Sequence, residues 1–330
     1  MEDAYVSTGS LPPAADVRAL VDEAYERFRT ESAGAVSEVY PALARMRPAL
    51  FGISVANAAG DIHVVGDADE PFTIMSVAKP FVFALVCDAI GWEETRERIG
   101  VNATGLAFNA LEAVSDDRDG RTNPMVNPGA IATTSLVPGA SHSERWRRIV
   151  DCLSAFAGRP LELDDEVYAS ASETNLRNRE LVALLERHGR IFGDPAEALD
   201  LYTRQSSLAV TARDLSVMGA TLADGGVNPL TRERVVSPAG CGKTLAVMAT
   251  AGLYETSGDW LYEVGLPGKS GIGGGIVTVS PGKGGLGTFA PLLDEAGNSV
   301  KGQQVARFLS RRLGLDVFAS APFAHDTNVT

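Results

Sequence analysis

A serine and a lysine three residues apart, Ser76 and Lys79, form the first pair in this sequence that could carry out chemistry. Residues three apart on a helix share one face, so the lysine amine can reach the serine hydroxyl one turn away. A neutral lysine in that position can remove the hydroxyl proton and make the serine a nucleophile without a histidine. The same spacing also occurs on ordinary exposed helices, so the pair alone leaves both interpretations open.

Neighbouring residues predict that the pair lies at the start of a buried helix. With Ser76 as the N-cap, residues 77–80 form the first turn, where the missing N–H of Pro80 breaks no helical bond. The next ten residues, FVFALVCDAI, are apolar nearly all round. The serine would then lie at the positive end of a helix dipole, which stabilises developing negative charge by ~0.3–1 kcal/mol. Pro80 opposes this arrangement in one respect, because it disfavours a helical backbone at Lys79.

A second lysine motif, KSG at residues 269–271, comes late in the sequence. It matches the strand motif K-[TS]-G that follows S-x-x-K in the penicillin-recognising enzymes, and its order is correct. Three other motifs fail because a required residue is absent. CGKT has Ser237 at the first glycine position of a P-loop, GIGGGI has Ile276 at the third glycine of a dinucleotide fingerprint, and the calcium-loop match at SDDRDG has Val126 at its last ligand position.

The pattern along the sequence predicts an α/β (α+β) fold with strands at both ends and helices between them. Residues 49–66 alternate around an Ala-Gly-Asp turn, as a β-hairpin does. Residues 264–300 are rich in glycine and short β-branched runs, which favours strands and tight turns. Strands from both ends could share one sheet. The predicted organisation is a loose arm at 1–16 and one domain at 17–330, with a sheet-containing part (17–90 and 255–330) and a helical subdomain (91–254).

Several capping residues predict where individual helices begin and end. Asp194 and Pro195 read as an N-cap and first helical residue, and Thr211 with Asp214 reads as a capping box. Gly189 is predicted to end the helix over NLRNRELVALLERHG. A last helix is predicted over GQQVARFLSRRLG.

Composition narrows the class of protein. The protein has 330 residues, of which 45% are hydrophobic and 22% charged, and its net charge is −13 without a basic stripe. Nucleic acid and anionic membranes are therefore not expected partners. No apolar run is long enough to span a membrane and the N-terminus lacks a signal-peptide pattern, so we predict a soluble, cytoplasmic protein. Three scattered cysteines and four histidines show no metal-ligand spacing, so no metal is expected.

From about residue 34 to 302 the sequence resembles the serine-dependent glutaminases, relatives of the β-lactamase and transpeptidase fold. The matching strings in order are PALFGISV, SVAKP, FN, NPMVNPGAI, YAS, TNLRNR, LDLY, ATLADGGVNP, GLYETSG and VGLPGKSGIGGGI. The resemblance implies an antiparallel sheet built from both ends of the sequence, flanked by helices and carrying an inserted helical subdomain. It also implies a small-molecule amide substrate, no cofactor, and a homodimer or homotetramer.

The same resemblance implies a role for each matching residue. Ser76 attacks the terminal carboxamide of glutamine and neutral Lys79 takes its proton. Lys269 keeps Lys79 neutral by like-charge repulsion, and Tyr254 relays protons. The backbone N–H groups of Ser76 and Ile272 form the oxyanion hole, typically worth ~2.7–4 kcal/mol per donor. The implied substrate-binding residues are Ser76, Asn127, Asn178, Tyr202, Tyr254 and Ile272.

These residues also have plainer interpretations. Asn127 and Asn178 could cap turns or helices, and Tyr202 could be an aromatic residue of the core. Only the aligned strings favour the functional interpretation.

Three positions depart from the family pattern, and each replaces a polar residue by an apolar one. Ala171 stands where a glutamate normally meets the substrate ammonium, Met75 where a glutamine precedes the nucleophile, and Val39 where a tyrosine is usual. Loss of a charged partner removes ~1.5–3 kcal/mol for the bond itself. Glu173 and Tyr40 are the neighbouring residues that could compensate.

The sequence therefore supports three hypotheses. The first is a glutaminase that hydrolyses L-glutamine to L-glutamate and ammonia through a serine acyl-enzyme. The second is a serine-lysine amidohydrolase for a different or α-blocked amide. The third is a non-catalytic binding or assembly homologue, which the presence of Ser76 and Lys79 argues against.

Overall fold

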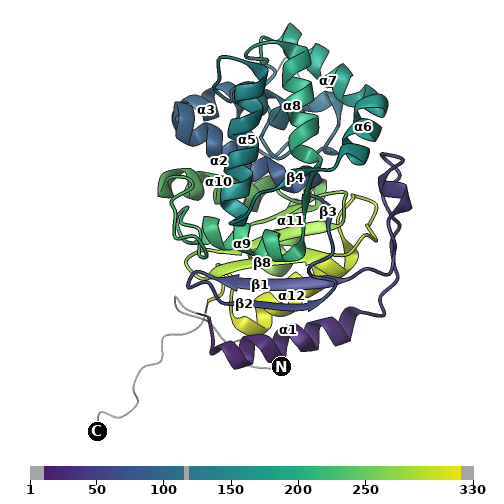
Figure 1. The fold of residues 1–330 in the computed structure, drawn as a ribbon, viewed down its shortest axis with the longest axis vertical. Coiled ribbons are helices and arrows are strands. Elements are labelled where there is room, and N and C mark those ends of the chain that lie inside the picture. Colours follow the sequence, from purple (N-terminus) through teal and green to yellow (C-terminus); the bar gives the residue numbers. More distant parts are fainter. Residues whose placement is uncertain (1–10, 115–118, 321–330) are drawn as a thin grey trace.

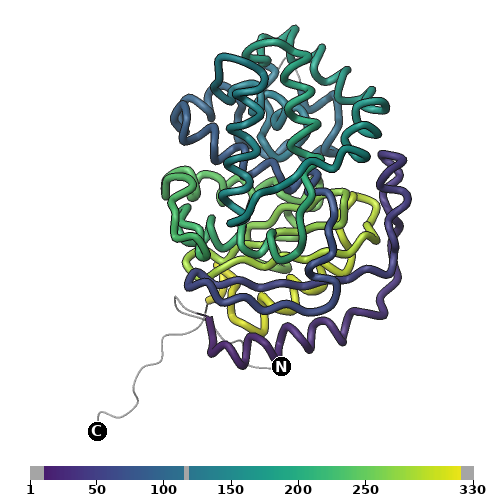
Figure 2. Tube along the Cα trace, in the orientation of Figure 1, coloured from purple at the N-terminus to yellow at the C-terminus, as the bar shows by residue number. Residues whose placement is uncertain are grey.

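The computed structural model describes residues 11–114 and 119–320, and Figure 1 shows its fold. A sheet with helices on both faces fills the lower half of that view, and a group of helices stands above it. Figure 2 shows the purple N-terminal and yellow C-terminal segments together in the lower half, while the middle of the sequence forms the upper half. The predicted fold class, with strands from both ends of the sequence in one sheet, is confirmed.

The main sheet has five antiparallel strands in the order β2-β1-β8-β7-β6. Their bounds are β1 Gly52–Asn57, β2 Ile62–Gly66, β6 Gly268–Ser270, β7 Gly275–Ser280 and β8 Gly284–Phe289. Strands β1 and β2 form the predicted hairpin, in which Ser54 faces Val64. Ser54 also pairs with Gly287 of β8, so the two ends of the sequence meet at the centre of the sheet. Lys269 and Ser270 of the KSG motif lie on a strand, as predicted; it is the edge strand β6, and Gly271 follows it.

Helices cover both faces of this sheet. Helix α1 (Ala14–Phe28) packs with α12 (Val300–Leu313) on one face, and α9 (Ala212–Ala223) lies across the other. The glycines of β8 allow α9 to lie directly on the strand backbone. A Cβ at Gly285 would lie 2.3 Å from Ser216 O, and one at Gly287 would lie 2.1 Å from Ala212 O. The glycine-rich sequence is thus a packing surface for a helix.

The buried helix α2 (Lys79–Ile90) lies at the centre of the upper part of the molecule, as its apolar sequence predicts. Further helices are α3 Trp92–Ile99, α4 Asn127–Ser135, α5 His142–Ala157, α6 Asp165–Thr174, α7 Leu176–Arg187, α8 Pro195–Ser206, α10 Pro238–Ala251 and α11 Ser257–Val264. Helix α2 packs mainly against α3, α4, α5 and α10, whereas α11 packs on α12. A small sheet of three strands, β3 (Phe72–Thr73), β5 (Leu208–Val210) and β4 (Glu162–Leu163), connects this part to the main sheet.

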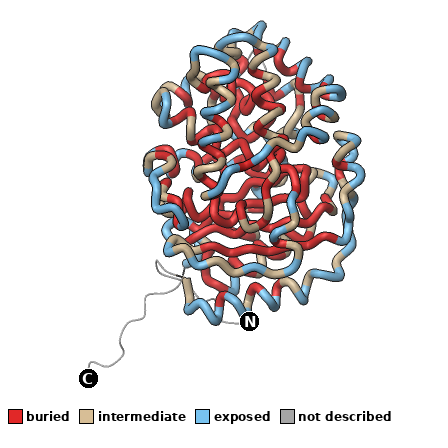
Figure 3. Tube along the Cα trace, viewed as in Figure 1, coloured by how far each residue is buried: buried red, intermediate tan, exposed pale blue. Residues whose placement is uncertain are grey.

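One large core joins the helices to the sheet. It contains residues of α2 together with Val277, Val279 and Phe289 of the sheet. Phe72 of β3 stacks on Phe289 of β8 with ring centroids 4.1 Å apart. Buried segments therefore run without interruption from the sheet into the helices (Figure 3). The division at residues 91 and 254 stays a prediction, and α9, inside that range, packs on the main sheet.

The predicted helix ends agree with the structure at the specific caps. Thr211 and Asp214 form a capping box, Asp194 caps α8, and Gly189 has a φ of +64° just after α7. Two predictions fall at undescribed positions: residues 1–10 of the arm, and residues 115–118 of the rejected calcium loop. The last three residues of the predicted arm belong to α1, which begins at Ala14.

In the described ranges, no single helix has the length and apolar character needed to cross a membrane. A bent pair, Met75–Ile90 with Trp92–Ile99, meets the criterion by length and composition only, and α2 of that pair is mostly buried in the protein.

Candidate active site

Ser76 lies one turn before the buried helix, and the predicted N-cap role is wrong. Residues Met75–Ala78 form a short 3₁₀ helix, and Ala78 takes the N-cap position of α2. Lys79 adopts helical angles (φ −55°, ψ −50°) despite the proline that follows it. Met75 has a φ of +47°, which is strained for a non-glycine residue. Because of this turn, Ser76 lines a pocket, with 8% of its surface exposed. Its hydroxyl does not cap the helix.

A glycine turn after β6 holds Ile272 beside this serine. A Cβ at Gly271 would lie 3.0 Å from Ile74 O and 3.2 Å from Ser76 N, while one at Gly273 would lie 2.4 Å from Thr73 O. Side chains at either position would push the two segments apart. The backbone of the turn can therefore approach the serine, and both Ser76 and Ile272 line the same pocket.

Lys79 is buried, with 1% of its surface exposed. Its Nζ donates to Asn127 Oδ1 at 2.7 Å and to the Met125 carbonyl at 3.3 Å. Burial lowers the pKa of Lys79 to about 7. We expected its amine to bond the serine hydroxyl directly, but the hydrogen bonds of the described residues include no Ser76–Lys79 pair.

Asn127 connects the lysine to two further predicted site residues. Its Oδ1 also accepts a hydrogen bond from the Tyr202 hydroxyl at 3.0 Å, and its Nδ2 donates to Asn178 Oδ1 at 2.9 Å. Asn127 is the first residue of α4, whose N-cap is Val126, and Asn178 lies inside α7. Neither asparagine is a helix N-cap, so the capping alternative does not account for them.

Tyr254 and Lys269 lie on the other side of the serine. The Tyr254 hydroxyl is hydrogen-bonded with Ser76, and burial raises the pKa of Tyr254 to about 12. It also donates to the Ser270 carbonyl at 3.3 Å, and its backbone φ is +58°. Lys269 Nζ lies 4.2 Å from the centre of the Tyr254 ring and donates to Ser270 O at 2.7 Å. Burial and the charge of Lys79 lower the pKa of Lys269 well below its usual value.

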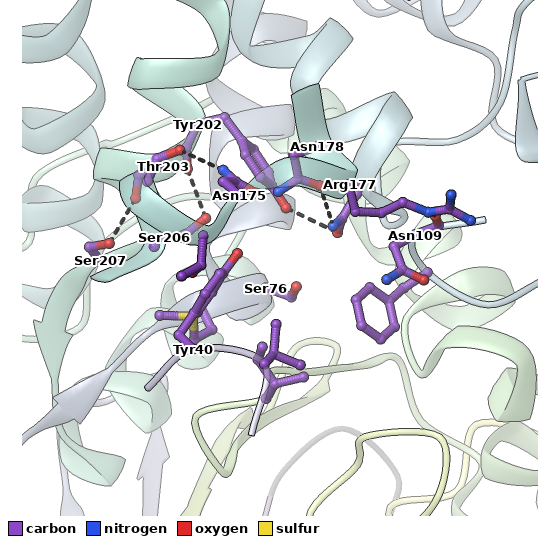
Figure 4. Close-up of a pocket in the computed structure, with 17 residues that line it drawn as sticks. Tyr40, Ser76, Asn109, Asn175, Arg177, Asn178, Tyr202, Thr203, Ser206 and Ser207 are labelled. Carbon is purple, nitrogen blue, oxygen red and sulfur yellow. Dashed lines mark hydrogen bonds between the residues drawn. The ribbon is translucent and has the colours of Figure 1, made fainter. Parts of the chain in front are cut away.

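The predicted site residues thus meet around one pocket or directly behind it. Ser76, Asn127, Asn178, Tyr202 and Ile272 line it. Outside the described lining, Lys79 bonds Asn127, Tyr254 bonds Ser76, and Lys269 lies against the Tyr254 ring. Figure 4 shows Ser76 at the centre of the pocket, with Tyr202 and Asn178 on one side and Tyr40 on another. In the described part of the protein, no group of three His, Cys, Asp or Glu residues could hold a metal ion.

All three departures from the family pattern line this pocket. Val39, Met75 and Ala171 are among its wall residues. Tyr40 lines the pocket too, and its burial raises the pKa of its hydroxyl. Glu173 is exposed and absent from the described lining, since two residues along a helix turn the side chain to the opposite side from Ala171. Tyr40 is therefore placed where its hydroxyl could replace the polar group lost at Val39. Glu173 is not placed to replace the carboxylate lost at Ala171.

Several residues of the pocket wall are not predicted from the sequence. These are Phe108, Asn109, Thr174, Asn175, Arg177, Thr203, Ser206 and Ser207. Most of them lie within or next to the strings FN, TNLRNR and LDLY. Because adjacent residues on a helix point in different directions, the strings alone do not tell which of their members face the pocket.

The arrangement defines a class of protein. An antiparallel sheet between helices, with S-x-x-K at the start of a buried helix and K-S-G on the edge strand, is the β-lactamase-like fold. Residues 34–318 match the family model described as Glutaminase. The chain belongs to the glutaminase family.

Individual relatives agree with this assignment. The protein is 67% identical to Glutaminase 2 of Yersinia pestis over 97% of this chain and 94% of that protein. It is 43% identical to a glutaminase of Colwellia psychrerythraea over 92% of this chain and 97% of that protein. The solved structure of the probable glutaminase ybaS superposes with a TM-score of 0.92 at 40% identity, covering 94% of this chain and 100% of that one.

Proposed function

We propose that this protein hydrolyses the terminal amide of L-glutamine to L-glutamate and ammonia through an acyl-enzyme on Ser76. The observation that carries the proposal is the state of the Lys79 amine. A neutral amine has two N–H donors and one lone pair, and acceptors at Asn127 and Met125 can take both donors. The lone pair then remains to accept the proton of Ser76.

Relatives support the choice of substrate. A structure of the related protein Mglu is described as an L-glutamate binding form. It superposes with a TM-score of 0.87 at 36% identity, covering 93% of this chain and 70% of that one. Glutamate is the product expected from glutamine hydrolysis, so this relative supports glutamine as the substrate.

In the first step, Ser76 Oγ attacks the amide carbon while its proton passes to Lys79. Backbone N–H groups of Ser76 and Ile272 stabilise the oxyanion, at ~2.7–4 kcal/mol per donor. The C–N bond breaks, and the amide nitrogen leaves as ammonia after receiving a proton by way of Tyr254. Tyr254 can donate this proton because its raised pKa keeps it protonated at neutral pH.

In the second step, water attacks the ester carbon. Its proton goes to the same base, and the Ser76–acyl bond breaks to give the carboxylate and restore the hydroxyl. Burial favours neutral Lys79 in both steps by lowering its pKa to about 7, and burial together with the charge of Lys79 disfavours protonation of Lys269 beside it.

The test compares Ser76→Ala with Ser54→Ala. Ser54 is also buried, but it lies in β1, where its hydroxyl bonds Ser216 of α9, and it is outside the described lining of the pocket. We expect Ser76→Ala to abolish ammonia release and labelling by an electrophilic glutamine analogue, and Ser54→Ala to keep both. Labelling of the Ser76→Ala variant at an undiminished rate would refute the serine acyl-enzyme. No turnover and no labelling in the wild type would favour the non-catalytic hypothesis.

The cytoplasmic location and the homodimer or homotetramer belong to the same proposal. Both rest on composition and family resemblance. Sedimentation of the purified protein would measure its oligomeric state.

A further inference from the structure

We infer that this active site prefers glutamine whose α-nitrogen carries no charge, with an N-acyl-L-glutamine as the favoured substrate class. The inference rests on the proposed amide hydrolysis at Ser76 and concerns which glutamine derivative the pocket accepts. It starts from the charges of the described residues that form the pocket.

No described residue that lines the pocket is acidic. The only formally charged group in the described lining is that of Arg177, a cation. Its guanidinium donates to Glu180 at 3.0 Å and to the Asn109 carbonyl at 3.0 Å. The two lysines behind the wall are also potential cations, and neither has a carboxylate partner among residues 11–114 and 119–320. The site therefore contains no described anion that could pair with an ammonium group.

Free glutamine carries such an ammonium group. Moving it from water into a pocket without a described counter-ion is unfavourable, because neutral oxygens accept its hydrogens but do not balance its charge. An acylated α-nitrogen is a neutral amide with one N–H. It needs one acceptor and carries no positive charge, while the α-carboxylate, which a cation such as Arg177 can balance, is common to both compounds.

Neutral acceptors of this kind are available in the wall. The Thr203 hydroxyl donates to the Leu199 carbonyl and the Ser206 hydroxyl donates to the Tyr202 carbonyl. Because each hydroxyl has a single hydrogen, both oxygens act as acceptors towards a ligand, and since Thr203 Oγ1 already accepts from Asn175 Nδ2 at 3.2 Å, one lone pair remains on it. That chemistry suits an amide N–H.

An apolar surface beside these acceptors suits the acyl group. Met75 and Ala171 are buried pocket residues, while Val39 is 50% exposed at the same pocket. Val167, Ala171 and Thr174 follow one another at helical spacing of four and three, so one face of α6 is turned to this region. The segment bearing Val39 and Tyr40 is held to that helix, since Ala42 N donates to Ser170 Oγ at 3.2 Å. An acetyl or longer acyl group would cover the exposed Val39 side chain.

The reaction on this substrate leaves the α-amide intact. Ser76 attacks the carbon of the terminal carboxamide, the C–N bond of that carboxamide breaks, and ammonia leaves. Water then releases N-acyl-L-glutamate, so one water is consumed for each ammonia formed.

The test measures kcat/KM for N-acetyl-L-glutamine and for L-glutamine with the full-length protein. We expect the acylated compound to be preferred at least tenfold by the wild type. Ala171→Glu places a carboxylate in the wall and should shift the ratio at least tenfold towards L-glutamine, whereas the neutral Ala171→Gln should not. Thr174→Glu, at an exposed wall residue one turn along, provides a second acidic variant if Ala171→Glu does not fold. Glu173→Gln, outside the described lining, is the control for surface charge.

The outcomes separate this inference from the proposed function. A wild-type preference for L-glutamine overturns the inference, and so do folded acidic variants that leave the ratio unchanged. If Ser76 is still acylated in those cases, amide hydrolysis stands and only the substrate preference is wrong. If neither compound releases ammonia and Ser76 is not labelled, the proposed function fails and the inference fails with it.

Discussion

At the scale of single residues, the proposed mechanism depends on the protonation of one buried amine. The Lys79 amine is enclosed, and among the described residues its partners are neutral. Desolvation therefore sets its pKa at about 7, well below the ordinary value of 10.5. Around neutral pH such an amine is available as a base without a histidine.

The activity should consequently fall as the pH is lowered through about 7. Protonated Lys79 has no lone pair for the Ser76 proton, so kcat/KM should drop about tenfold per pH unit on the acid side of that value. The measurement is kcat/KM for the amide substrate between about pH 5 and 9. A profile that stays flat over the acid half of that range would contradict the assignment of Lys79 as base.

Asn127→Asp is a sharper version of the same experiment. It replaces the neutral acceptor 2.7 Å from the amine by a carboxylate, which favours the charged lysine. An adjacent opposite charge raises a lysine pKa by ~1–3 units, so the acid limb should move to higher pH by at least one unit. Asn127→Ala removes the acceptor without adding charge, and the limb should not move upward in that variant.

At the scale of elements, the position of β6 and of the turn after it depends on close backbone contacts between neighbouring segments. Helix α9 lies on the glycines of β8, and the turn after β6 lies on the segment that carries Ser76. Both contacts depend on the absence of a Cβ. The glycines in the sequence make these contacts possible. The contacts set the distance between the segments and so bring Ile272 close to Ser76.

Gly285→Ala should therefore destabilise the protein, because its Cβ would lie 2.3 Å from the Ser216 carbonyl oxygen. We expect the free energy of unfolding to fall by about 1–3 kcal/mol, the usual cost of overpacking. Gly242→Ala is the matched control. It lies exposed within α10 with nothing within 4 Å of the added Cβ, and should stabilise by about 0.5–1 kcal/mol. Equal unfolding midpoints in denaturant for the two variants would contradict this account.

At the scale of the whole molecule, the sheet and the upper helices share one core. The stacked pair Phe72 and Phe289 lies where the small and main sheets meet. The pocket is also assembled across this region, since its wall takes residues from α6, α7 and α8 and from the turn after β6. Loss of packing here should affect both parts together.

Phe289→Ala should lower the free energy of unfolding by about 3–5 kcal/mol and leave a single transition. The physical reason is a cavity in a core that both parts share. Tryptophan fluorescence and far-UV circular dichroism should give the same midpoint in an equilibrium denaturant titration. Phe318→Ala, at a residue that is 64% exposed, should stay within about 0.5 kcal/mol of wild type. Two separate transitions would show that the layers unfold independently.

The sequence by itself determined the local elements and the chemical groups. Alternation around a turn specified the hairpin, the caps at Thr211 and Asp194 specified helix starts, and an all-apolar run specified that α2 is buried. These features depend on residues a few positions apart, so short strings are sufficient to predict them.

Only the tertiary structure decided which groups meet. The partners of the Lys79 amine come from residues 46 and 48 positions away, and Tyr254 reaches Ser76 from far along the sequence. The 3₁₀ turn that displaces Ser76 from the N-cap, and the direction in which Glu173 points, likewise follow from packing. Such contacts depend on how distant segments fill space together, and no short string contains that information.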